Sequence, residues 1–228
     1  MPPPPATIVD VGGGAGVHAL WLAKRGYAAH LVEPVPVHLE QARAASDAQP
    51  EAPLASVQLA DARELPFVDG SVDAVLLFGP LYHLAERADR LAALGEARRV
   101  LRPGGALAAI GISRYAFLLD GLVSGRVFTL PDRLDLVTRS VETGEVAEPF
   151  TTAYLHRPEE LAEEVREAGL EVEELLGVEG PGWLLGQFNR TWADERQREI
   201  LLQLAELVEA ERDLVAASTH MLVVARRR

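Results

Sequence analysis

Several residue types are scarce in this chain of 228 residues, and each scarcity excludes a class of function. The chain has no cysteine, which excludes a disulfide-stapled scaffold, a cysteine-ligated zinc site, an iron–sulfur cluster and a cysteine nucleophile. It has 22 basic and 34 acidic residues, which give a net charge of −12, and Lys24 is the sole lysine. Such a surface repels a polyanion over most of its area, so we expect no nucleic-acid partner.

Long apolar runs and metal-ligand spacings are also lacking. No segment approaches the roughly 20 apolar residues that a membrane span needs. The proline-rich start, Met1 to Pro5, has neither the basic nor the apolar region of a signal peptide. His30 and His38 do not have the spacing of a metal site, so no metal is expected. The sequence therefore predicts a cytoplasmic protein that does not attach to a membrane.

The composition is globular, with 48% hydrophobic and 25% charged residues, and short apolar runs alternate with helical patterns. We expect strands at residues 7–11, 28–32, 56–60, 72–78, 106–113, 171–178 and 220–225, and helices at 17–25, 36–47, 84–101, 158–168 and 194–216. This alternation predicts an α/β fold, a Rossmann-like, doubly wound, mostly parallel seven-stranded sheet with helices on both faces. Residues 114–155 break the rhythm and are predicted to be an insertion in a single domain spanning residues 1–228.

A glycine-rich turn, Gly12 to Gly16, follows the first predicted strand, and Asp10 lies just before it. Such a turn lets the backbone approach a ligand closely and directs the start of the next helix toward it. The dinucleotide fingerprint needs glycine at position 17, where this chain has Val17, and no Gly-Lys-Ser/Thr of a P-loop follows. The observed spacing is Gly-x-Gly-x-Gly.

Further motifs follow at the ends of later strands. Glu33 ends the second strand, 21 residues after Gly12, and Asp61 and Ala62 follow the third. The segment Phe78-Gly-Pro-Leu-Tyr-His-Leu84 follows the fourth strand, and Leu101-Arg-Pro-Gly-Gly105 precedes the fifth. Because parallel strands end at the same edge of a sheet, these residues are expected to share one ligand site.

In this order, over about residues 6–113, the motifs resemble those of the class I S-adenosyl-L-methionine (SAM)-dependent methyltransferases. The resemblance implies SAM as the cofactor, with Glu33 accepting hydrogen bonds from the ribose hydroxyls and Asp61 from the adenine amino group. Taken alone, Asp10 and Glu33 could be ordinary polar residues at strand ends, and Asp61 a turn cap. The cofactor-binding residues it implies are Asp10, Gly12, Gly13, Gly14, Gly16, Glu33, Asp61, Ala62 and Phe78.

Tyr82 and His83 are the candidate catalytic residues, because they lie where the resemblance places the methyl group. A histidine there could accept a proton from a hydroxyl or amine acceptor. The alternative is that both only shape the wall of the site. His18, next to the glycine turn, either packs beside it or contacts the methionine carboxylate.

The expected function is transfer of a methyl group from SAM to an oxygen, nitrogen or carbon atom of a small molecule. The alternatives are a non-catalytic SAM- or nucleoside-binding regulator and, less in keeping with Val17, a nicotinamide oxidoreductase. Residues 114–155 are expected to complete the acceptor pocket. The sequence does not decide between a monomer and a homodimer. Six residues, four of them proline, precede the first strand, so no helical lid is expected from them. Either the true start of the protein lies upstream, or the lid comes from the insertion or from a partner chain. The expected acceptor-binding side chains are Arg114, Tyr115, Tyr154, His156 and Trp183.

Overall fold

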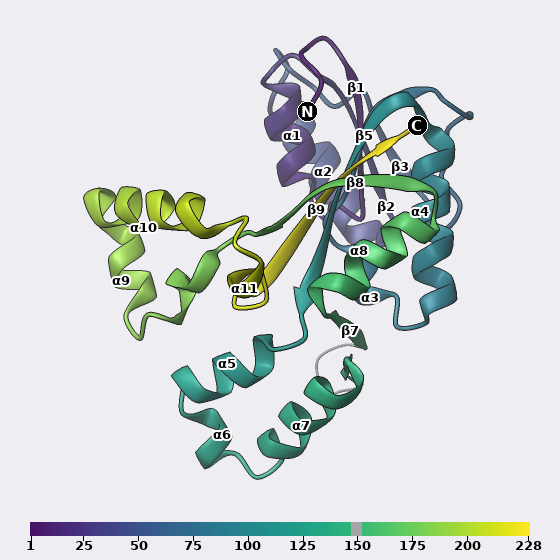
Figure 1. Ribbon diagram of the computed structural model, residues 1–228. Helices are drawn as coiled ribbons and strands as arrows, with labels where there is room; N and C mark the ends of the chain where they lie inside the picture. Colours follow the sequence, from purple (N-terminus) through teal and green to yellow (C-terminus); the bar gives the residue numbers. More distant parts are fainter. Residues whose placement is uncertain (147–151) are drawn as a thin grey trace. The chain divides into compact units, whose positions relative to one another are not determined.

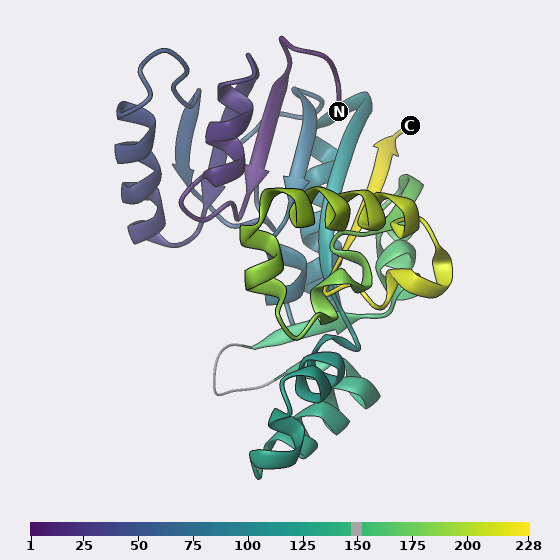
Figure 2. The ribbon, with the colours of Figure 1, turned by 90° about the vertical axis from the view of Figure 1, so that its left-hand side faces the viewer.

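A computed structural model describes residues 1–146 and 152–228 (Figures 1 and 2). The chain divides into two compact units. Unit 1 comprises residues 1–110, 163–173 and 224–228, and unit 2 comprises residues 111–162 and 174–223. Four elements contribute residues to both units: β5 (Leu101–Ser113), α8 (Pro158–Glu167), β8 (Leu170–Gly177) and β9 (His220–Arg227).

The centre of unit 1 is a parallel sheet. Its strands β1 (Thr7–Val11), β2 (Ala28–Glu33), β3 (Ser56–Leu59) and β4 (Val72–Leu77) join β5 in the order β3-β2-β1-β4-β5. Every neighbouring pair along this order is parallel. The direction of strand order reverses between β1 and β4, and open α/β sheets bind their ligands at such a switch point.

Helices of unit 1 pack on the sheet through small and aliphatic side chains. α1 (Val17–Ala23) buries Ala19 and Leu22, and α2 (Pro36–Asp47) buries Leu39 and Ala42. α4 (Arg87–Val100) buries Ala93, Leu94 and Ala97, and Figure 1 shows α1 and α4 on opposite sides of the strands. Each fully buried leucine contributes about 1.5–3 kcal/mol to stability. The packing fixes the ends of β1, β2 and β4 relative to one another.

The α/β prediction is confirmed: the sheet is mostly parallel and has helices on both faces. Nine strands are found among the described residues, against seven expected. The additional strands are β6 (Glu145–Val146) and β7 (Ala153–His156), which form an antiparallel pair, and β7 also pairs in parallel with the end of β5. β9 pairs with both β5 and β8. Both extra strands arise in the segment expected to be an insertion.

Unit 2 is mainly helical. After β5 come α5 (Ala116–Val123), α6 (Arg126–Thr129) and α7 (Arg133–Thr143). After β8 come the 3-10 helix η1 (Gly180–Leu184), α9 (Phe188–Ala193), α10 (Glu195–Val208) and α11 (Arg212–Val215). Part of the expected insertion, residues 147–151, lies outside the described residues. Within the described ranges, none of the helices combines the length and apolar character needed to cross a bilayer.

Two predicted helices were wrong in extent. The helix expected at 194–216 is divided: Asp194 caps α10 by accepting from the Gln197 N–H, and α10 ends before Glu209, whose carbonyl accepts from the Gly177 N–H. The helix expected at 84–101 starts at Arg87, because residues 80–83 form the separate short helix α3 (Pro80–His83). The single domain with an insertion stays a prediction.

Candidate functional site

A cleft of about 400 Å³ opens in unit 1 beyond the ends of β1, β2 and β4. This volume falls in the range of small-molecule sites, roughly 300–1,000 Å³. The cleft brings together most of the predicted site residues, while Asp10, Gly13, Gly16 and Phe78 lie outside its lining. The lining residues are Gly12, Gly14, Glu33, Pro34, Val35, His38, Asp61, Ala62, Gly79, Pro80, Tyr82, His83 and Leu84.

The glycine turn after β1 forms one wall. Gly12 has a φ of +66°, and a Cβ there would lie 2.8 Å from Cγ of Pro80, so the turn packs directly on α3. Gly14 has a φ of +58°, and a Cβ there would meet no protein atom within 4 Å. Because Gly14 also lines the cleft, its missing side chain leaves open space where a ligand can approach the backbone.

Asp10 lies underneath this turn. It is 1% exposed, its Oδ2 accepts a hydrogen bond from the Ala19 N–H at 3.2 Å, and its Oδ1 has no hydrogen-bond partner in the described part of the chain. A Cβ on Gly13 would lie 2.4 Å from the same carboxylate, which explains the second glycine of the turn. Burial raises the pKa of Asp10 to about 7, with the Ala19 N–H opposing the rise and the charge of Glu33 adding to it. Asp10 therefore supports the turn from below and has no surface in the cleft lining.

Glu33, at the end of β2, connects the glycine turn to α2. Its Oε2 accepts from the Gly14 N–H at 3.0 Å, and its Oε1 accepts from the Val35 N–H at 3.1 Å. The same Oε1 lies 3.1 Å from Nδ1 of His38, the third residue of α2. Only 4% of Glu33 is exposed, so this carboxylate is held firmly at the cleft wall.

Asp61 follows β3 and is bound by a neighbouring arginine. Its two carboxylate oxygens accept from Nε and Nη2 of Arg63, each at 2.8 Å, and Oδ1 also accepts from the Arg63 N–H. These bonds hold the pKa of Asp61 below its usual value. Nη1 of Arg63 also forms an ion pair with Oδ2 of Asp89 on α4, at 3.0 Å. Asp61 thus stays an ionised acceptor at the cleft edge, beside the buried Ala62.

Tyr82 and His83 line the cleft from α3. Their rings lie 4.7 Å apart between centroids. Burial lowers the pKa of His83, an effect that the charge of Glu33 partly opposes, and burial raises the pKa of Tyr82. At neutral pH, His83 is therefore a neutral imidazole able to take up a proton, and Tyr82 is a protonated phenol able to donate a hydrogen bond.

Phe78 and His18 pack against each other beside this wall. Their ring planes are perpendicular and their centroids 5.1 Å apart. This contact agrees with the packing interpretation of His18. Partial burial lowers the pKa of His18.

A buried arginine fixes the chain just after His83. Nη1 of Arg90 donates to the carbonyls of Leu84 at 3.0 Å and Ala85 at 2.6 Å. Nε and Nη2 of Arg90 form a two-pronged bond to Glu164 on α8, at 2.9 and 2.8 Å. Arg90 is 1% exposed and Glu164 3%, so the pair is shielded from water and keeps its geometry.

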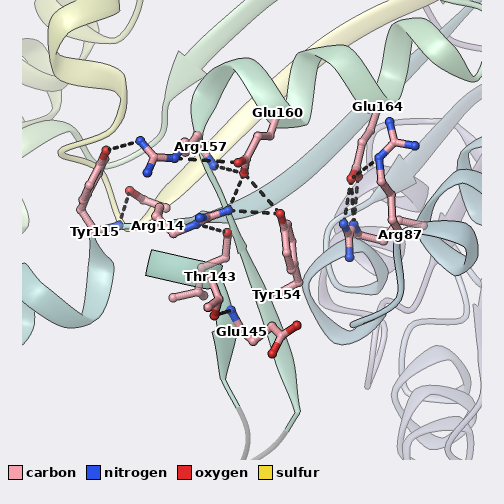
Figure 3. Close-up of polar contacts among 12 residues, drawn as sticks. Arg87, Arg114, Tyr115, Thr143, Glu145, Tyr154, Arg157, Glu160 and Glu164 are labelled. Carbon is pink, nitrogen blue, oxygen red and sulfur yellow. Dashed lines mark hydrogen bonds and ion pairs between the residues drawn. The ribbon is translucent and has the colours of Figure 1, made fainter. Parts of the chain in front are cut away.

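In unit 2, three of the side chains expected to bind an acceptor, Arg114, Tyr115 and Tyr154, are engaged in hydrogen bonds within the unit (Figure 3). Arg114, which is 3% exposed, donates to the Leu155 carbonyl at 2.7 Å, to the Tyr154 hydroxyl at 3.1 Å and to Glu160 at 2.6 Å. Arg157 donates to the Tyr115 hydroxyl at 3.1 Å. These bonds stabilise unit 2 internally, and the predicted contact with an acceptor stays a prediction.

The other two predicted acceptor-binding residues are also held inside unit 2. His156 is fully buried, with its ring 4.8 Å from that of Tyr154. Trp183 donates from Nε1 to the Ala217 carbonyl at 2.7 Å.

Two residues that shape the cleft escaped the sequence analysis. His38 was considered only as a metal ligand, although Pro36 opens α2 and so places the third helical residue beside Glu33. A sequence signal for this contact does exist. His38 lies five residues after an acid that ends a strand, and a proline between them starts the next helix. No local signal marks Arg90, because its partner Glu164 lies 74 positions later.

The family model described as a methyltransferase domain matches residues 9–109. An uncharacterized methyltransferase of Mycobacterium tuberculosis is 32% identical over 164 residues, which are 70% of this chain and 59% of that protein. A protein of Acidiphilium cryptum named a ubiquinone/menaquinone biosynthesis C-methyltransferase is 35% identical over 114 residues, 50% of this chain and 45% of that protein. The chain thus spans less than two thirds of the length of both relatives.

Solved structures show the same fold. A crystal structure of a SAM-dependent methyltransferase from Methanosarcina mazei matches with a TM-score of 0.64 and 17% identity, over 98% of this chain and 92% of that one. The family match ends at residue 109, before the helical segment of unit 2, so the similarity is greatest in the part of the chain that carries the cleft.

Proposed function

Because residues 9–109 of this chain form a methyltransferase domain of the class I SAM-dependent family, we propose that the protein transfers the methyl group of SAM to an oxygen, nitrogen or carbon atom of a small molecule. The cleft at the ends of β1, β2 and β4 is the observation that carries this proposal. It combines an open glycine turn, two carboxylates and two histidines in one site.

The residues present fit the cofactor of the family. The space next to Gly14, where a Cβ would meet no protein atom, leaves room for a ligand against the backbone. We assign Glu33 to the ribose hydroxyls, since a carboxylate can accept from two neighbouring hydroxyls at once. We assign Asp61 to the adenine amino group, because Arg63 keeps this carboxylate ionised and one position on Oδ2 is still able to accept.

SAM supplies a methyl group on a sulfonium, which is already an activated leaving group. The protein then contributes mainly by holding the acceptor in line with the methyl carbon. His83 accepts the proton that a hydroxyl or amine acceptor loses as its new bond to the methyl carbon forms and the bond from carbon to sulfur breaks. Tyr82, a phenol at neutral pH, orients the acceptor by donating a hydrogen bond.

Three observations support a small-molecule acceptor. The cleft is of small-molecule size, the surface is strongly acidic, and the similar A. cryptum protein is named for the biosynthesis of quinones, which are small molecules. Completion of the acceptor pocket by residues 114–155 is part of the proposal.

The test is turnover with SAM and a panel of hydroxyl, amine and carbon-acid acceptors, followed as release of S-adenosylhomocysteine. We expect release with at least one acceptor and loss of it on heating. Tight S-adenosylhomocysteine binding with no turnover across a broad panel would favour the non-catalytic alternative. Saturable NADH binding in the same cleft would contradict the proposal.

A further inference from the structure

We propose that His38 competes with the ribose hydroxyls of a nucleoside ligand for the Glu33 carboxylate, and so lowers the affinity of the cleft for the cofactor. This inference rests on the proposed function, in which Glu33 binds the ribose. His38 lines the same cleft, and its Nδ1 lies 3.1 Å from Oε1 of Glu33.

The argument starts from the acceptor capacity of a carboxylate. An ionised carboxylate has about four lone-pair positions, two on each oxygen. In Glu33, the Val35 N–H and His38 occupy the two positions on Oε1, and the Gly14 N–H occupies one on Oε2. One position is left, whereas two adjacent hydroxyls that bind to both oxygens need two. One of the three present donors must therefore leave when a ribose binds in this way.

His38 is the donor that can leave most readily. The other two are backbone N–H groups, one in the turn after β1 and one directly before α2, so their release would require movement of the main chain. The His38 side chain is 42% exposed and can rotate toward solvent about its own bonds. Its departure frees the second position on Oε1 with no change in the fold.

The experiment measures binding of S-adenosylhomocysteine, adenosine and 2′,3′-dideoxyadenosine by calorimetry at one fixed pH. His38→Leu removes the donor and should tighten binding of the two ribose ligands about three- to tenfold, the size expected for a partly exposed bond to a charged group. The gain should be absent for the dideoxy ligand. His38→Asn, which keeps an N–H near the Nδ1 position, should bind like the wild type.

Val37→Ala, at the exposed neighbouring residue of α2, is the matched control and should leave the affinity for all three ligands unchanged. His38→Ala repeats the test should His38→Leu fold poorly. Unchanged or weaker binding in both variants would overturn the inference, and so would an equal gain with the dideoxy ligand. A wild-type protein that binds none of the three ligands would instead count against the proposed function.

Discussion

The buried carboxyl of Asp10 makes the stability of this protein depend on pH in an unusual direction. The side chain is 1% exposed, and its pKa is raised from 3.8 to about 7. Between these two values the folded chain holds a proton on Asp10 that the unfolded chain has released. Stability therefore decreases as pH rises through this window, the reverse of the usual behaviour of carboxylates in ion pairs.

The size of the effect follows from the shift. One pKa unit corresponds to about 1.4 kcal/mol, so Asp10 alone should lower the free energy of unfolding by about 2–3 kcal/mol from pH 5 to pH 8. Asp10→Asn removes the titration. Its amide keeps an acceptor for the Ala19 N–H but buries a donor at the position of the unpartnered Oδ1, at a pH-independent cost of about 1–3 kcal/mol.

Urea unfolding of the wild type and of Asp10→Asn at pH 5, 6, 7 and 8 provides the assay. The difference in stability between the two proteins should shift by about 2–3 kcal/mol in favour of the variant as the pH rises across this range. Glu40→Gln, which removes an exposed carboxylate on α2, controls for net charge and should follow the wild type. Parallel pH profiles for wild type and Asp10→Asn would refute the reasoning.

Three further predictions concern the cleft and its support. Gly14→Val should reduce S-adenosylhomocysteine affinity at least about tenfold, since its side chain would enter the open space, and calorimetry on the folded variant showing unchanged affinity would contradict this. His83→Ala should lower kcat by about 10²-fold and leave the KM for SAM within a few-fold. Wild-type activity should rise with pH to a plateau, with its midpoint below the ordinary histidine pKa of 6.5, because burial lowers the pKa of His83. Glu164→Gln should cost about 3–5 kcal/mol in urea unfolding, because it removes the carboxylate charge that Nε and Nη2 of the buried Arg90 bind; a loss under 1 kcal/mol would show that the pair is unimportant.

The parallel sheet could be predicted because its signals are local. The first four strands lie within one residue of their expected limits, and α2 starts and ends where expected, since apolar runs end at glycine, proline or an acid. The carboxylates Glu33 and Asp61 were found for the same reason: each directly follows a strand, and the ends of parallel strands meet at one edge.

The rest of the site depends on contacts that no sequence pattern marks. Arg63 lies only two residues after Asp61, but its binding of both carboxylate oxygens depends on the conformation of the turn. The acid that binds Arg90 comes from another part of the chain. The division of the expected helix at 194–216 is similar, because no glycine or proline marks it. The Glu209 carbonyl that accepts from the Gly177 N–H lies between the two shorter helices.

The discontinuous make-up of unit 1 has a consequence for how the protein is synthesised. Chains emerge from the ribosome amino end first, so residues 1–110 are complete well before residues 163–173, which belong to the same unit. Until Glu164 emerges, Arg90 lacks the carboxylate that accepts from its Nε and Nη2 in the folded protein. A fragment cut at the limits of the family match, residues 9–109, would carry every residue that lines the cleft and still lack the acid that lets Arg90 stay buried.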